Sequence, residues 1–108
     1  MVRLKPPIHI AEEKLTRYLL TPLPTNDKST YLKLAGYTLD NWPVLARDLL
    51  LLAETEPATL EDVTEYGDSF SIVSTLTGPN ERQLRVKTIW MREISTGLTK
   101  FITLYPPR

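Results

Sequence analysis

Three stretches of the sequence decide the fold: SFSIVSTLT at 69–77, QLRVKTIWMR at 83–92 and LTKFITLY at 98–105. Each is rich in β-branched and aromatic residues, and each alternates with the period of two that is typical of a β-strand. The sequences GPNE (78–81) and EISTG (93–97) between them have the composition of hairpin turns. We therefore predict three consecutive antiparallel strands.

The last of these strands has large apolar side chains in both of its alternating sets. Strict alternation places Ile102 and Leu104 on one face, and Phe101 and Tyr105 on the other. A strand that is apolar on both faces is central in its sheet or is covered on both sides.

The remaining elements lie upstream of these strands. A fourth strand is expected at 59–66, because Gly67 and Asp68 offer a turn into the next strand. Pro6 and Pro7 favour an extended lead over residues 1–8. Apolar residues at helical spacing predict helices at 10–20, 28–36 and 40–54. The predicted fold class is α+β, with two or three N-terminal helices packed on one face of a four-stranded antiparallel meander.

Size and composition limit the classes of function. A chain of 108 residues, 42% of them hydrophobic, can bury one core, so we expect a single domain over 1–108. It has no cysteine and a single histidine, His9, so we expect no disulfide, no metal site and no cofactor. The longest apolar run, at 49–53, is too short to cross a membrane. A cysteine-free chain of this kind fits a cytoplasmic protein.

The charges are unevenly distributed although the formal net charge is zero. Residues 1–39 carry six basic and three acidic side chains, residues 40–81 carry one and nine, and residues 82–108 carry six and one. The charges either interleave on the folded surface or produce a bipolar molecule whose basic side meets phosphate or an acidic partner. Four carboxylates gather around the first hairpin, where they fit a solvated sheet edge better than a metal site: Glu61, Asp62, Glu65 and Asp68.

Basic residues on the third strand form the main candidate site. Arg85 and Lys87 are two residues apart, so they share a sheet face. We expect Arg92 nearby and Tyr105 adjacent on the last strand. The alternative interpretation is that these exposed cations only keep the protein soluble.

The leucine run of the third helix is a second candidate surface. Leu49 to Leu52 cover more than one helix face, so the helix is buried nearly all round or meets another copy of the chain. We therefore expect a homodimer.

Several short motifs, taken in order, resemble an uncharacterised bacterial domain family. That family reads K-L-x-x-Y-x-L-x-P-x-H-P, then E-Y-G, G-P, a strand with Trp and a terminal T-x-Y, and the similarity spans residues 14–105. Family members occur as small free proteins and as C-terminal pieces of phage-head and secreted toxin-like proteins. Their layout is similar to the small ribonucleases barnase and the RelE-type toxins. The matching residues are Lys14, Tyr18, Pro22, Pro24, Lys28, Gly36, Tyr37, Glu65, Tyr66, Gly67, Gly78, Pro79, Trp90, Thr103 and Tyr105.

The resemblance implies a set of functional residues and also one departure. It implicates Lys28, Thr103 and Tyr105, whereas the loop histidine of the family pattern is replaced here by Leu23. RNA cleavage needs a proton acceptor near the ribose 2′-hydroxyl and cations for the developing charge on phosphorus. Without that histidine, any catalytic role falls to Lys28, Arg85, Lys87 and Tyr105, or is lost. Arg92 and Thr103 are assigned to binding.

Two functions from different classes follow from the sequence. The first is a small cytoplasmic accessory or interaction protein, linked to toxin or phage systems, whose partner is a protein. The second is a ribonuclease-like protein, active or degenerate, that acts on RNA. The two are distinguished by whether the four candidate catalytic residues converge or scatter.

Overall fold

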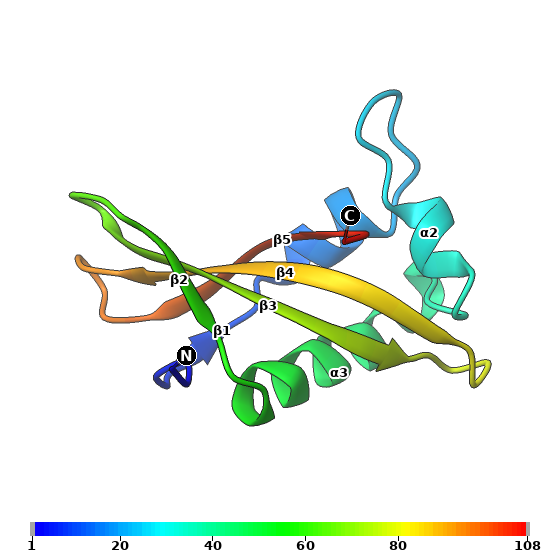
Figure 1. Cartoon of the computed structure of the whole chain (residues 1–108). Helices are drawn as coiled ribbons and strands as arrows, with labels where there is room; N and C mark the ends of the chain where they lie inside the picture. The colour runs from blue at the N-terminus through cyan, green and yellow to red at the C-terminus, as the bar shows by residue number, and fades with distance from the viewer. Residues whose placement is uncertain (1, 108) are drawn as a thin grey trace.

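The computed structural model describes residues 2–107 and contains a five-stranded mixed sheet with helices on one face (Figure 1). The spatial order of the strands is β1-β5-β4-β3-β2. The last four form an antiparallel meander, and β1 pairs in parallel with β5. The strands are β1 (Ile8–His9), β2 (Thr59–Val63), β3 (Gly67–Thr77), β4 (Gln83–Glu93) and β5 (Thr99–Tyr105).

The α+β class is confirmed, but the prediction of four strands is wrong by one. Ile8 pairs with Thr99 and His9 with Lys100, inside the segment that was expected to be an extended lead and helix entry. The Thr99 amide also donates a hydrogen bond of 2.9 Å to the carbonyl of Pro7. Two residues are too short for a periodicity to be visible, and their partner strand lies about ninety residues away in the sequence.

The helical segments are short, apart from α3. Leu15 and Leu19 are fully buried in the first segment, which widens into a π-helix whose closing hydrogen bond joins the Leu20 amide to the Leu15 carbonyl at 2.9 Å. The second helix is only five residues long and ends before Gly36, where the backbone turns with a φ of 90°. The bounds are α1 (Glu12–Lys14), η1 (Leu15–Leu19), α2 (Ser29–Lys33), η2 (Leu39–Asn41) and α3 (Trp42–Thr55).

The leucine run of α3 is divided between the core and solvent. Leu49 and Leu52 are buried, whereas Leu50 and Leu51 are 37% and 59% exposed. The helix is therefore an ordinary amphipathic helix with two surplus apolar side chains on its outer side. No helix of the described part of the chain is long and apolar enough to cross a membrane.

The core lies between the sheet and the helices, and Trp90 is at its centre. This side chain is fully buried on β4, and its ring meets Phe101 of β5 edge-on with 5.2 Å between centroids. Its indole N–H donates to the hydroxyl of Thr88 at 2.8 Å, and that hydroxyl donates to the carbonyl of Ile72 at 3.2 Å. The polar atoms of this part of the core are therefore satisfied.

Candidate functional site

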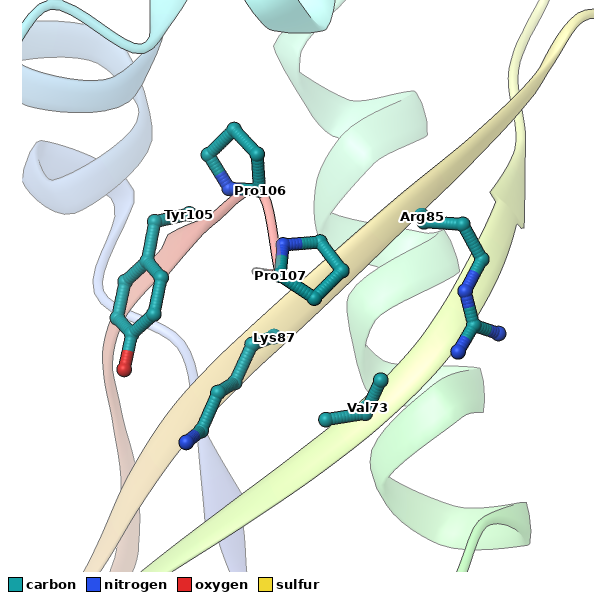
Figure 2. Close-up of a pocket in the computed structure, with 6 residues that line it drawn as sticks. All are labelled: Val73, Arg85, Lys87, Tyr105, Pro106 and Pro107. Atoms are coloured by element: carbon teal, nitrogen blue, oxygen red, sulfur yellow. The ribbon is translucent and has the colours of Figure 1, made fainter.

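The face of the sheet that the helices leave open carries a broad hollow of about 1050 Å³. It lies over β3, β4 and the end of β5 (Figure 2). No carboxylate lines it among the residues that the structure describes. The lining residues, which we call the basic hollow, are Val73, Arg85, Lys87, Tyr105, Pro106 and Pro107.

The alternation of β4 places both cations on this face. Val86 and Thr88 are fully buried beneath the helices, so Arg85 and Lys87 between and beside them point the other way. Burial of Val86 in the core thus fixes Arg85 and Lys87 on the outer face. A shift of the strand register by one residue would expose Val86 and bury a charge.

A bulge in β5 brings Tyr105 to the same face. Trp90 pairs with Phe101 but Ile89 pairs with Thr103, so Ile102 is an extra residue in the ladder. Strict alternation predicts one face for Phe101 and Tyr105, and that expectation is wrong. Phe101 is buried beside Trp90, whereas Tyr105 lies directly opposite Lys87 and lines the basic hollow.

The polar groups of the basic hollow form two clusters. Lys87 and Tyr105 reach in the same direction on one side of Pro107, and Arg85 lies on its other side (Figure 2). The Arg85 guanidinium donates a hydrogen bond of 3.2 Å to the hydroxyl of Thr75, its partner on β3. Arg85 is thus held in place by Thr75, whereas Lys87 lies beside Tyr105.

Lys28 lies at the edge of this face and not in the hollow. Its ammonium donates to the hydroxyl of Thr103 at 3.2 Å and lies 5.3 Å from the centroid of the Tyr18 ring, which is a cation–π distance. Thr103 precedes Tyr105 by two residues on β5, a separation of about 7 Å along a strand. Lys28 therefore extends the basic surface beyond the tyrosine.

Asp27 fixes the backbone that carries Lys28. Its carboxylate accepts hydrogen bonds from the Ser29 hydroxyl at 2.6 Å, the Ser29 amide at 3.0 Å and the Thr30 hydroxyl at 3.1 Å. The Ser29 hydroxyl bond is the largest cause that lowers the pKa of Asp27 from its ordinary value of 3.8. The charged carboxylate is thereby bonded to the first two residues of α2, so Lys28 enters the site from a defined turn.

Arg92 is not part of this surface. It occupies an even position of β4 and so faces the opposite side of the sheet from Lys87. Its Nη1 donates to the carbonyls of Lys5 at 3.0 Å and Pro6 at 3.2 Å. The expectation that Arg92 lies beside the other cations is therefore wrong, and its visible contacts hold the N-terminal segment against the sheet.

Sequence reasoning missed three residues that support the site. Thr75 holds Arg85, Tyr18 faces Lys28, and the Tyr31 hydroxyl donates to the carbonyl of Arg85 at 2.5 Å. The last contact satisfies a backbone acceptor of β4 beyond the end of β5. Only Thr75 had a usable signal, since its position on the open face of β3 follows from alternation.

Among the described residues, neither a metal-binding group nor a histidine that could act as an acid–base catalyst lies in the basic hollow. Within residues 2–107 there is no group of three histidine or acidic side chains placed to hold a metal ion. His9 pairs with Lys100, five residues from Tyr105 along β5, which is about 17 Å in a strand. The basic hollow can therefore attract and orient an anion with cations and one hydroxyl.

Comparisons with known proteins identify a family and a fold. A family model described as "Domain of unknown function (DUF6883)" matches residues 6–108. Among curated proteins, none matches the chain. Among solved structures, the fold is similar to that of a chain from the "Contact-dependent growth inhibition toxin - immunity protein complex from Klebsiella pneumoniae 342", with a TM-score of 0.72 and 19% identity. The match covers 91% of this chain and 98% of that chain.

Proposed function

This chain belongs to the DUF6883 family, a domain of unknown function, and we propose that it is a toxin-like domain that acts on RNA through the basic hollow. The family recognised from the motif order is thereby confirmed, and the fold shared with a chain from a toxin–immunity complex supports a toxin-related role. The observation that carries the proposal is the convergence of Arg85, Lys87 and Tyr105 on one open face, with Lys28 at its edge.

The arrangement suits a phosphate chain better than a single phosphate. Arg85 and Lys87 are two residues apart on β4, about 7 Å along the strand, which is close to the phosphate spacing of an extended single strand. The guanidinium offers a planar fork to phosphate oxygens, and the ammonium offers a compact charge. Tyr105 adds a hydroxyl and an aromatic ring on which a base can stack.

RNA binding comes before RNA cleavage in this proposal. The cations can stabilise charge on a phosphate during attack by the ribose 2′-hydroxyl. The proton acceptor for that step would have to be the neutral amine form of Lys28 or Lys87, or the oxygen of Tyr105, because an ammonium has no lone pair and neither a histidine nor a carboxylate lines the described hollow.

The test is the salt dependence of RNA binding. Fluorescein-labelled oligouridine of twelve nucleotides is titrated with protein, and fluorescence anisotropy is measured at several salt concentrations between about 20 and 200 mM. Each phosphate contact contributes about 0.7 to the slope of log affinity against log salt. The double variant Arg85→Ala with Lys87→Ala should therefore flatten the slope by about 1.4 and weaken binding at low salt.

A matched control removes the same charge elsewhere. Lys5 and Lys33 are exposed and do not line the hollow, so Lys5→Ala with Lys33→Ala should leave the slope nearly unchanged. Equal loss in both double variants would mean that only net charge matters, and absence of binding by the wild type at low salt would overturn the proposal.

Cleavage is tested on the same RNA, without added metal and with a chelator. Appearance of shorter products that Tyr105→Phe or Lys87→Ala abolishes would assign catalysis to the hollow. Binding without cleavage would assign the chain to the degenerate form of the ribonuclease-like class.

A protein-interaction role is the second candidate. The structural neighbour is described as part of a toxin–immunity protein complex, so a protein partner is reasonable for this chain as well. A homodimer through Leu50 and Leu51 is the simplest version, since both are exposed on α3. Light scattering at about 50 μM protein tests it, and a monomer mass there excludes it.

A further inference from the structure

The most exposed large apolar side chains of the described chain gather at one place. Tyr66, Ile94 and Val63 are 70%, 68% and 67% exposed, more than any other large apolar residue of the chain described. Val63 ends β2, Tyr66 lies in the turn between β2 and β3, and Ile94 lies in the turn between β4 and β5. These two hairpins project together at the end of the sheet opposite α2 (Figure 1), and we call residues 63–67 and 93–97 the hairpin tip.

The two turns are joined to each other. The Ile94 amide donates to the Tyr66 carbonyl at 3.0 Å, and the side chains of both residues line a small hollow of about 240 Å³ with Glu65, Glu93 and Ser95. Tyr66 and Ile94 therefore form one surface and not two separate loop ends.

The first turn is held in shape by Thr64. Its hydroxyl donates to the Gly67 carbonyl at 2.8 Å and accepts from the amides of Tyr66 and Gly67 at 3.2 Å each. Gly67 lies so close to β4 that a Cβ there would be 2.1 Å from the Arg92 carbonyl oxygen. Tyr66 is thus presented by an ordered turn, so little conformational entropy is lost when it binds.

The second turn is ordered in a similar way by Thr96. Its hydroxyl donates to the Glu93 carboxylate at 2.8 Å and accepts from the Leu98 amide at 3.2 Å. The Gly97 amide donates to the Glu93 carbonyl at 2.9 Å. Ile94 is therefore held next to Tyr66 by bonds within its own turn.

Carboxylates surround this apolar surface. Of the carboxylates around it, only Glu93 forms a salt bridge within the described residues, with Lys100 at 3.1 Å. The region is consequently acidic as well as apolar, which is the opposite of the basic hollow. The carboxylates of the rim are Asp62, which precedes Val63 on β2, and Glu65 and Glu93, which line the small hollow with Tyr66 and Ile94.

We propose that the hairpin tip is a docking site for a protein partner that presents an apolar socket rimmed by lysine or arginine. Exposed aromatic and branched side chains on a rigid support are typical anchors of protein interfaces, and the acidic rim selects the charge of the partner. The same rim repels RNA, an anionic membrane and the tip of a second copy. The site is independent of RNA binding, because Arg85 and Glu93 are eight residues apart on β4, about 27 Å.

The experiment uses a phage-displayed library of random sixteen-residue peptides as the probe, selected against the full chain. Selected peptides should combine apolar residues with an excess of Lys and Arg. Their affinity, measured with synthetic peptides by calorimetry, should fall at least about tenfold in the double variant Tyr66→Ser with Ile94→Ser, because hot-spot residues carry such a share of binding. It should also fall as salt is raised.

The control is Leu51→Ser, which changes a residue that is 59% exposed on α3, outside the tip. It should leave peptide affinity unchanged, and thermal unfolding should show that all variants are folded. The proposal is overturned if no selected peptide distinguishes the tip variant from the control, or if acidic and basic peptides bind equally. It is also overturned if the tip variant abolishes self-association in light scattering or binding to vesicles of phosphatidylglycerol and phosphatidylcholine.

Discussion

Replacement of Trp90 by alanine tests the account of the core most directly. The side chain is fully buried on β4, contacts Phe101 edge-on and is hydrogen-bonded to Thr88. Truncation removes nearly the whole indole and leaves a cavity between the sheet and the helices. Such a change costs about 3–5 kcal/mol, whereas the total stability of a domain is about 5–15 kcal/mol.

The expected effect on thermal unfolding follows from the size of the chain. For a domain of about one hundred residues, 1 kcal/mol shifts the midpoint by about 4–8 °C. Trp90→Ala should therefore lower the midpoint by at least about 12 °C, measured by far-ultraviolet circular dichroism and checked by urea unfolding. Trp90→Phe keeps a ring beside Phe101 and should lose less than half as much.

The control for this experiment is Tyr66→Ala, which truncates another aromatic residue that is 70% exposed. Exposed substitutions usually change stability by less than about 0.5 kcal/mol, so its midpoint should move by no more than a few degrees. A shift of only one or two degrees for Trp90→Ala would refute the reasoning, because it would mean that the indole contributes little to the packing between sheet and helices.

Three other substitutions test particular contacts. Gly78→Ala should cost about 1–3 kcal/mol in urea unfolding, because its Cβ would lie 1.9 Å from the carbonyl oxygen of Ala35. Tyr37→Phe should cost about 1–2 kcal/mol by the same measurement, since it removes a 2.7 Å hydrogen bond to a carboxylate of α3. Hydrogen bonds from Ser29 lower the pKa of Asp27, so its charged form stabilises the fold above pH 3.8 and this contribution is lost as pH falls through the lower folded value. The midpoint difference between wild type and Asp27→Asn should therefore be present at pH 7 and shrink as pH falls below 3.8.

The strands of the meander could be predicted because their cause is local. Each of the strands at 69–77 and 83–92 has one face buried under helices, and burial imposes a visible alternation on the sequence. The same alternation correctly placed Arg85 and Lys87 together. The short strand β1 could not be predicted, because its two residues carry no period and are held by a partner at the other end of the chain.

The candidate site depended on the register of β5, which the sequence does not reveal. Without the extra residue Ile102, Tyr105 would lie opposite Val86 and point into the core, and the tyrosine and Lys87 would be separated. The fully buried Leu104 shows why the bulge is favoured, since it restores an apolar residue to the core face opposite Thr88. A bulge leaves no simple mark in a run of alternating residues.

Arg92 shows that the sequence does not reveal which groups a charged side chain will contact. Its charge and its position near Arg85 and Lys87 in the sequence made it a candidate binding residue. Its even position in β4 places it on the other face of the sheet, however, and its hydrogen-bond partners are carbonyls of a segment more than eighty residues away. The sequence shows that a residue is charged, but the assembled fold determines which backbone carbonyls that residue contacts.

The zero net charge of the chain conceals two surfaces of opposite sign. The basic hollow and the acidic hairpin tip are separated by most of the length of β4, about 27 Å, whereas charges in physiological salt are screened over about 8 Å. Each surface therefore acts on its own ligand with little electrostatic effect on the other. A partner bound at the tip should leave the affinity of oligouridine for the hollow unchanged, unless the partner is large enough to reach around the sheet. Anisotropy titrations of RNA with and without a saturating tip-binding peptide measure this directly, and a large change in affinity would show that the two surfaces are coupled through the fold.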